Sequence, residues 1–213
     1  MREIDLTERS DEKMKVRLEP AARAVRDGDL IIVPTTTFYG LAADATNDLA
    51  VRRVFKAKRR DPSKPLLILV DSLSMMRPFV SEVPGAVKEL EWRLGSKGLT
   101  YVLPSSGRLP DELTAGTGTV GVRVERNEVV RELLALLELP ITAPSANVEG
   151  ESPPETVDDA VRPLRDWIEV SIRWYRASAT APSTIVDLSR DEPGILREGT
   201  VPARDVLDVL EAA

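Results

Sequence analysis

The sequence predicts an α/β fold, in which strands alternate with helices along much of the chain. Short apolar runs rich in β-branched residues, such as DLIIVP (residues 29–34) and PLLILV (65–70), are typical of buried strands. Segments whose apolar residues recur at helical spacing separate several of these runs. The chain has 213 residues, 42% of them hydrophobic and 30% charged, so a core of useful size is available.

The chain divides into a short polar beginning and one long domain. Residues 1–14 are mostly polar or charged, and we expect them to form a flexible segment. Residues 15–213 contain no repeat, low-complexity stretch or convincing linker, so we expect a single domain. The N-terminus lacks the apolar centre of a signal peptide, and no apolar run approaches the roughly 20 residues of a membrane span. We therefore expect a cytoplasmic protein without membrane contact.

Caps and breakers mark the ends of the predicted elements. Gly28 is a suitable stop for the first helix, and Asn47 can cap the second. The predicted helices cover residues 18–28, 48–60, 72–80, 84–94 and 127–139, with two more beginning near 155 and 203. The predicted strands cover residues 29–34, 65–70, 99–104, 120–124, 140–143, 167–174, 183–188 and 194–198.

Composition restricts the possible chemistry. The chain has no cysteine and no histidine, which excludes disulfides, thiolate metal sites and a Ser-His-Asp triad. Catalysis would therefore depend on carboxylates, lysine, arginine, tyrosine, hydroxyls, amides or an oxygen-bound metal ion. The formal net charge of −6 argues against extensive non-specific binding of nucleic acid, although a local basic patch can still hold phosphates.

Such a basic patch ends the second predicted helix, where six lysines and arginines lie within residues 52–60. Lys58 follows the i, i+3, i+4, i+7 spacing of an apolar stripe, so it lies on the face that points inward. Lys58 either serves a function there, or its stem snorkels at the edge of the stripe and the cations simply suit the helix C-terminus. The other members of the stripe are Val51, Val54 and Phe55.

Loops rich in hydroxyl groups adjoin several predicted strands. PTTTFYG (residues 34–40) and PSAN (144–147) follow strands, whereas TAGTGTVGVR (114–123) and PSTIVD (182–187) lead into them. Such loops at strand ends commonly bind small ligands, and their hydroxyl and N–H groups suit phosphate, carboxylate or ribose. The same residues are also ordinary turn formers. Neither a P-loop nor a GxGxxG pattern is present.

Two arginines interrupt predicted strands. Arg123 alternates with valines and is costly to bury unless it is paired, so it either binds a carboxylate or lies on an exposed strand face. Arg197 in GILREG presents the same choice. Phe38 and Tyr39 are interpreted as packing residues rather than a stacking platform.

Taken together, these motifs resemble the YrdC-like threonylcarbamoyl-AMP synthase family. Residues 29–60 are similar to the family's opening, in which a Pro-Thr-x-Thr-x-Tyr-Gly-Leu loop precedes a helix ending in Lys-x-Arg. KPLLILV, LTYVLP, TVGVRV, APSAN, PSTIVDL and ILREG are similar to later family motifs in the same order. The resemblance covers roughly residues 15–205. It implies a twisted mixed β-sheet with flanking helices around a concave ligand site.

The resemblance implies a nucleotidyltransferase that makes threonylcarbamoyl-AMP and pyrophosphate from L-threonine, bicarbonate and ATP, with Mg²⁺ accompanying ATP. Its product would feed tRNA modification through downstream threonylcarbamoyl-transfer proteins. The implied catalytic residues are Lys58, Arg60, Ser145 and Asn147. The implied ATP contacts are Arg60, Lys64, Thr119, Ser145, Pro153 and Arg197. The implied threonine contacts are Thr37, Leu69, Arg123, Ala143 and Ser183.

Three positions depart from the family pattern. Thr36 stands where the family usually has Glu, and Leu69 where many members have His near the threonine pocket. Asp61-Pro62 follows Arg60, where the family often has Pro directly. The change at Leu69 can alter the amino-acid preference. The chain also resembles the short form of the family, without an extra C-terminal domain.

Three other interpretations stay open at this point. An RNA-binding protein of the same fold would use the basic patch, although the acidic total and the 4% of aromatic residues weaken this interpretation. A carbamoyl-transfer domain of the hydrogenase-maturation type would be accompanied by acylphosphatase and Cys-rich zinc segments, which this chain lacks. A diverged paralogue would bind nucleotide without the threonine reaction, as the changes at Thr36 and Leu69 allow.

Overall fold

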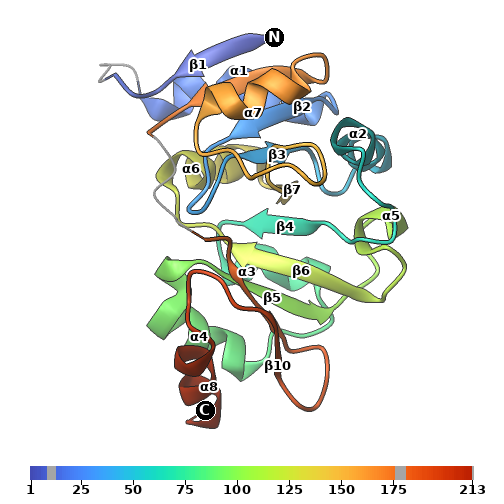
Figure 1. The fold of residues 1–213 in the computed structure, drawn as a ribbon, viewed down its shortest axis with the longest axis vertical. Helices are drawn as coiled ribbons and strands as arrows, with labels where there is room; N and C mark the ends of the chain where they lie inside the picture. Colours follow the sequence, from blue (N-terminus) through green and yellow to red (C-terminus); the bar gives the residue numbers. More distant parts are fainter. Residues whose placement is uncertain (9–12, 176–180, 213) are drawn as a thin grey trace.

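A computed structural model describes residues 1–8, 13–175 and 181–212 (Figure 1). The helices are α1 (Met14–Arg26), α2 (Asp48–Lys58), α3 (Leu73–Met76), α4 (Gly85–Leu94), α5 (Asp111–Thr114), α6 (Glu128–Leu137), α7 (Val157–Leu164) and α8 (Ala203–Glu211), with 3-10 turns η1 (Arg77–Phe79) and η2 (Gly95–Lys97). The strands are β1 (Arg2–Asp5), β2 (Leu30–Val33), β3 (Gly40–Ala42), β4 (Leu67–Val70), β5 (Leu99–Pro104), β6 (Thr119–Val124), β7 (Ile141–Thr142), β8 (Ile168–Arg173), β9 (Thr184–Asp187) and β10 (Gly194–Arg197).

The strands form two mixed sheets, which confirms the predicted α/β fold. The four-stranded sheet has the order β1-β8-β2-β3, in which only β2 and β3 are antiparallel. The six-stranded sheet has the order β10-β9-β5-β6-β4-β7, and its pairs alternate between antiparallel and parallel. In Figure 1 the smaller sheet lies near the N-terminus and the larger one extends toward the C-terminus.

Hydrogen bonds between β3 and the β7 region join the two sheets. The backbone N–H of Leu41 donates to the carbonyl of Pro144 (2.9 Å), and that of Thr142 donates to the carbonyl of Ala43 (2.9 Å). An isolated antiparallel bridge pairs Gly40 with Ser145. The loop after β2 and the loop after β7 therefore lie beside each other.

The central strands are buried on both faces, which explains their unbroken apolar sequence. Leu30 and Ile32 of β2 face one apolar cluster, which also contains residues of α2, α4, α7 and α8. Ile31 and Val33 face a second cluster formed with α1 and α6. An apolar strand without alternation is the pattern expected when helices cover both sides of a sheet.

The expectation of a flexible N-terminal segment is wrong for its first residues. Arg2–Asp5 form β1, which pairs in parallel with β8 and places Ile4 beside Ile172. Ile4 and Leu6 are buried, and two apolar residues in a charged segment are too weak a pattern to reveal such a strand. Residues 9–12 lie outside the described residues, and the predicted domain over 15–213 stays a prediction.

Other boundaries differ modestly from the predicted ones. β3 lies within the stretch predicted as a loop. The strand was not predicted, because three residues are too few to show an alternating pattern. The helix predicted over 72–80 becomes α3 followed by η1, and Pro78 lies in that 3-10 turn. In the part of the chain that the structure describes, no helix has the length and apolar character needed to cross a membrane.

Candidate functional site

A cavity of about 410 Å³ opens over one face of the six-stranded sheet. Its floor consists of alternate residues of the strands, and its walls come from the loops after β2 and β7, the segment after α2, and β10. Nine of the thirteen predicted site residues line it: Thr37, Arg60, Thr119, Arg123, Ala143, Ser145, Pro153, Ser183 and Arg197.

Strand periodicity explains how the floor forms. Thr119, Gly121 and Arg123 of β6 line the cavity, whereas the valines between them face the apolar core. In β5, Thr100 and Val102 line the cavity while the intervening residues enter the core. Successive side chains of a strand point to opposite faces, so the alternating sequence TVGVRV places polar groups in the cavity and apolar groups beneath it.

The cavity is positively charged. Arg60, Arg123 and Arg197 line it, and none of its described lining residues is acidic. Burial lowers the pKa of Arg60 below its ordinary value, and burial together with the nearby charge of Arg123 lowers that of Arg197. Partly desolvated guanidinium groups without a carboxylate in the wall favour the binding of anions.

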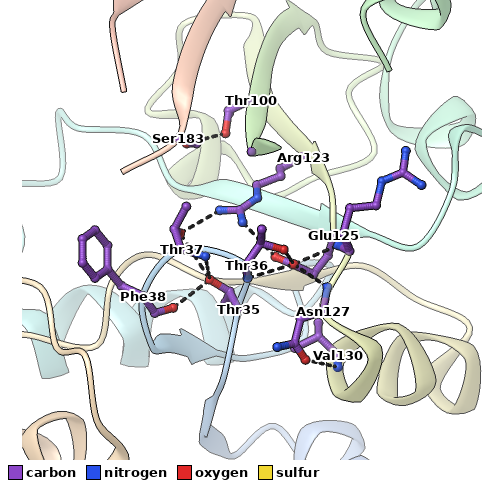
Figure 2. A network of polar contacts seen from close by, with 12 residues as sticks. Thr35, Thr36, Thr37, Phe38, Thr100, Arg123, Glu125, Asn127, Val130 and Ser183 are labelled. Atoms are coloured by element: carbon purple, nitrogen blue, oxygen red, sulfur yellow. Dashed lines mark hydrogen bonds and ion pairs between the residues drawn. The ribbon is translucent and has the colours of Figure 1, made fainter. Parts of the chain in front are cut away.

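Arg123 is buried and contacts the loop after β2 (Figure 2). Its Nη1 donates to the hydroxyl of Thr37 (3.0 Å), whose backbone N–H donates to the hydroxyl of Thr35 (3.2 Å). Nη2 makes no hydrogen bond to any described residue, although Oε2 of Glu125 lies 3.2 Å away. Of the two alternatives for Arg123, the exposed strand face is wrong, because the guanidinium is buried beside Thr37 and Glu125; its binding of a carboxylate ligand stays a prediction.

Ser183 links the other side of the cavity to the floor. Its hydroxyl shares a 2.8 Å hydrogen bond with that of Thr100. Nη2 of Arg197 donates to the carbonyl oxygen of Ser183 (2.9 Å) and lies 3.3 Å from its hydroxyl. Arg197 is thereby held over the floor by β9, instead of extending freely into solvent.

Lys58 faces inward as predicted, but it does not line the cavity. It is 2% exposed, so the snorkelling alternative is wrong. Its Nζ donates to the carbonyl oxygens of Ser145 (2.5 Å) and Asn147 (2.6 Å), and burial, followed by the charge of Arg60, lowers its pKa to about 8. Both bonds hold the loop after β7, and the implied catalytic role of Lys58 stays a prediction.

Arg60 reaches the cavity because the chain turns sharply after α2. Arg59 ends the helix in the left-handed conformation with a φ of 50°. Arg60 then donates to the carbonyl oxygens of Lys64 (3.0 Å) and Pro65 (2.9 Å). Lys64 itself does not line the cavity, since it forms an exposed ion pair with Glu149, whose pKa is lowered by that bond and by the backbone N–H of Asp61.

Asn147 also lies outside the cavity wall. Its Nδ2 donates to the carbonyl oxygens of Val148 (2.9 Å) and Glu151 (2.8 Å), so the side chain shapes its own loop. Its Oδ1 is buried without a hydrogen bond to the described residues. In this structure Asn147 positions the loop that carries Ser145.

Leu69 lies on the same face of the sheet as Leu67 and Arg123, but it does not line the cavity. It is 1% exposed and packs into the cluster formed with α1 and α6, beside Arg123 in the strand register. The expected contact with threonine stays a prediction, because the cluster with α1 and α6 covers Leu69 and keeps it out of the described cavity lining. Tyr39 is a packing residue as predicted, whereas Phe38 lines the cavity.

Sequence reasoning missed Glu125, which is fully buried at the end of β6. Its carboxylate accepts hydrogen bonds from the loop after β2 and faces Arg123 (Figure 2). The available signal was the acidic residue two positions after Arg123, which continues the cavity face of the strand.

The family model for Sua5/YciO/YrdC domains, described as "Telomere recombination", matches residues 23–199. The chain belongs to the Sua5/YciO/YrdC family. Two curated archaeal relatives are similar to it. A threonylcarbamoyl-AMP synthase from Pyrococcus abyssi is 35% identical over 207 residues, covering 97% of this chain and 60% of the relative. A putative threonylcarbamoyl-AMP synthase from Methanocaldococcus jannaschii is 30% identical and covers 93% of both chains.

A solved structure of this family has the same fold. The crystal structure of P. abyssi Sua5 complexed with L-threonine superposes with a TM-score of 0.92 at 33% identity, and it covers 99% of this chain. The chain spans 61% of the length of that Sua5 protein.

Proposed function

We propose that this chain is an L-threonylcarbamoyladenylate synthase, which makes threonylcarbamoyl-AMP and pyrophosphate from L-threonine, bicarbonate and ATP. One observation carries the proposal: a single cavity gathers residues from motifs that are far apart along the chain, with three arginines and no acidic side chain among its described lining residues. Such a cavity suits two anionic substrates. Membership of the family and the names of its curated relatives support the same reaction.

Threonine is proposed to bind between Arg123 and Ser183. Arg123 lines the cavity, and its Nη2 pairs with Glu125 without a hydrogen bond, so this nitrogen can still donate to the substrate carboxylate; the hydroxyls of Thr37 and Ser183 offer further hydrogen bonds. Ala143 would form the apolar wall that contacts the methyl group of the threonine substrate. The neutral amine of threonine would condense with bicarbonate, forming the N–C bond of a carbamate and releasing one water molecule.

ATP is proposed to bind toward Arg60 and Arg197, with Thr119, Ser145 and Pro153 completing the subsite. A carbamate oxygen would attack the α-phosphorus, and the bond to the bridging oxygen of pyrophosphate would break. The chain's contribution is to bring two anions together and to stabilise charge on the phosphates. Lys64 would exchange Glu149 for a phosphate oxygen.

Mg²⁺ is proposed to enter as part of the Mg·ATP substrate. The described lining residues offer hydroxyl and carbonyl oxygens but no carboxylate, and no group of three or more Asp or Glu residues in the described chain is arranged to hold a metal ion. The phosphate oxygens would therefore supply its anionic ligands.

The product would pass to proteins that transfer the threonylcarbamoyl group to tRNA. Because a carbamate–phosphate anhydride is labile, rapid transfer is chemically required. Direct contact with tRNA or other RNA, and the cytoplasmic location, stay predictions.

The deciding experiment is pyrophosphate release from Mg·ATP and bicarbonate, with and without L-threonine. We expect threonine-dependent release, reduced at least about tenfold by Arg197→Ala. Arg190→Ala is the matched control, since Arg190 lies outside the cavity and its side chain is 80% exposed. If folded wild type binds ATP without releasing pyrophosphate, the proposal is contradicted and the chain is better explained as a nucleotide-binding paralogue. If the chain instead binds RNA in a salt-dependent way without turnover, the RNA-binding interpretation is favoured.

A further inference from the structure

Glu125 is a buried carboxylate without a part in the reaction described above. Its Oε1 accepts hydrogen bonds from the backbone N–H groups of Thr36 (3.0 Å), Arg126 (2.8 Å) and Asn127 (2.9 Å), and from the hydroxyl of Thr36 (Figure 2). One oxygen thus joins the loop after β2, the end of β6 and the first turn of α6, where Asn127 is the N-cap.

The second oxygen of Glu125 is directed at Arg123. Because four donors fix Oε1, the direction of Oε2 is also fixed, and it lies 3.2 Å from Nη2 of Arg123. Thr37 holds Nη1 of the same guanidinium from the other side. A buried arginine without a charged partner is strongly unfavourable, so this carboxylate compensates the charge of Arg123 and holds the guanidinium in place before the substrate arrives.

The position of Thr36 gives this arrangement a further meaning. Both the N–H and the hydroxyl of Thr36 contact the Glu125 carboxylate. A glutamate at position 36 would bring its own carboxylate into the space next to that of Glu125. A negative charge beside Arg123 can therefore come from the end of β6, where Glu125 provides it, or from a carboxylate introduced at position 36 of the loop.

We infer that Glu125 acts as a positioning residue, which holds the loop after β2 through Oε1 and faces Arg123 through Oε2. It orients Arg123 and the loop 35–37 toward the carboxylate of the amino-acid substrate. This inference rests on the proposed function, because it assigns a specificity role within the same cavity.

The first test is Glu125→Gln, with separate measurement of kcat and of KM for threonine and ATP. We expect KM for threonine to rise about ten- to hundredfold while KM for ATP changes little, because only the threonine subsite depends on Arg123. Glu128→Gln is the control, since Glu128 is exposed three residues away and loses the same charge. Equal changes in both KM values, or no change, would overturn the inference.

The second test moves the carboxylate with the double variant Thr36→Glu/Glu125→Gln. We expect its KM for threonine to return to within about threefold of wild type, whereas Thr36→Glu alone places two carboxylates together and lowers activity. A folded double variant whose KM for threonine stays about tenfold or more above that of wild type would overturn the inference. This comparison needs only wild type, so it holds even if Glu125→Gln alone does not fold. Wild type without threonine-dependent turnover overturns the proposed function as well, whereas active wild type with an unaffected Glu125→Gln overturns the role of Glu125 alone.

Discussion

The side-chain nitrogen of Lys58 lies 2.5 Å from the carbonyl oxygen of Ser145, so the last turn of α2 holds the loop that follows β7. The backbone N–H of Glu149 returns the contact by donating to the carbonyl of Lys58 (2.9 Å). The Lys-x-Arg and Ser-x-Asn motifs are therefore hydrogen-bonded to each other, and each fixes the backbone position of the other. Ser145 reaches the cavity because Lys58 anchors its backbone from behind.

Lys58→Met should destabilise the chain and reduce activity together. Methionine fills the space of the lysine stem but leaves two buried carbonyl oxygens without a donor, at a cost of about 2 to 4 kcal/mol. Urea unfolding and pyrophosphate release measure the two effects. Lys56→Met is the control, because Lys56 is exposed on the same helix. Unchanged stability would mean that the two hydrogen bonds do not support the loop.

The lowered pKa of Lys58 predicts a pH dependence of stability. Its pKa is about 8 in the folded chain against an ordinary 10.5, so between these values the unfolded chain binds a proton that the folded chain has released. Stability from this group therefore rises as the pH increases through that window, and is lowest below about pH 8. The difference in unfolding free energy between wild type and Lys58→Met should increase over the same range, since other titrating groups cancel. A constant difference would show that Lys58 keeps its ordinary pKa.

Arg123→Lys and Arg197→Lys should separate the two subsites. Lysine retains the charge but loses the planar fork, so Arg123→Lys should raise KM for threonine by about tenfold or more with a small effect on KM for ATP. Arg197→Lys should have the opposite pattern. Steady-state kinetics with each substrate varied in turn provides the measurement. If both variants raise the same KM, the proposed division of the cavity is incorrect.

Glu149→Gln should strengthen ATP binding modestly. Glu149 pairs with Lys64, and removal of its charge frees the lysine for a phosphate. Exposed ion pairs contribute about 0 to 1 kcal/mol, so KM for ATP should fall by at most about fivefold, with the larger effect at low salt. Glu151→Gln, at an exposed position of the same loop, is the control. A rise in KM for ATP would instead assign Glu149 to nucleotide binding.

Several features of the site were predictable because they depend on local spacing. The period-2 alternation of TVGVRV fixed which residues of β6 face together, and the helical spacing fixed that Lys58 points inward. Other features were not predictable, because they depend on contacts between distant segments. Whether the nitrogen of Lys58 meets a phosphate or two carbonyl groups depends on where the loop after β7 lies, and no pattern in α2 encodes that position. The family resemblance likewise predicts Leu69 near the threonine pocket, but whether Leu69 reaches the cavity depends on how α1 and α6 pack against β4.

By itself the sequence determined the α/β class, the order of most elements and the family, because these follow from periodicity, caps and ordered motifs. Only the tertiary structure decided that β1 completes the smaller sheet, that Lys58 anchors a loop instead of lining the cavity, and that Glu125 faces Arg123. These outcomes depend on hydrogen bonds and ion pairs between segments far apart in the chain. A charged side chain is buried only where hydrogen-bond or ion-pair partners compensate its loss of hydration. The fold decides which partners lie within reach, and they set the direction of the side chain.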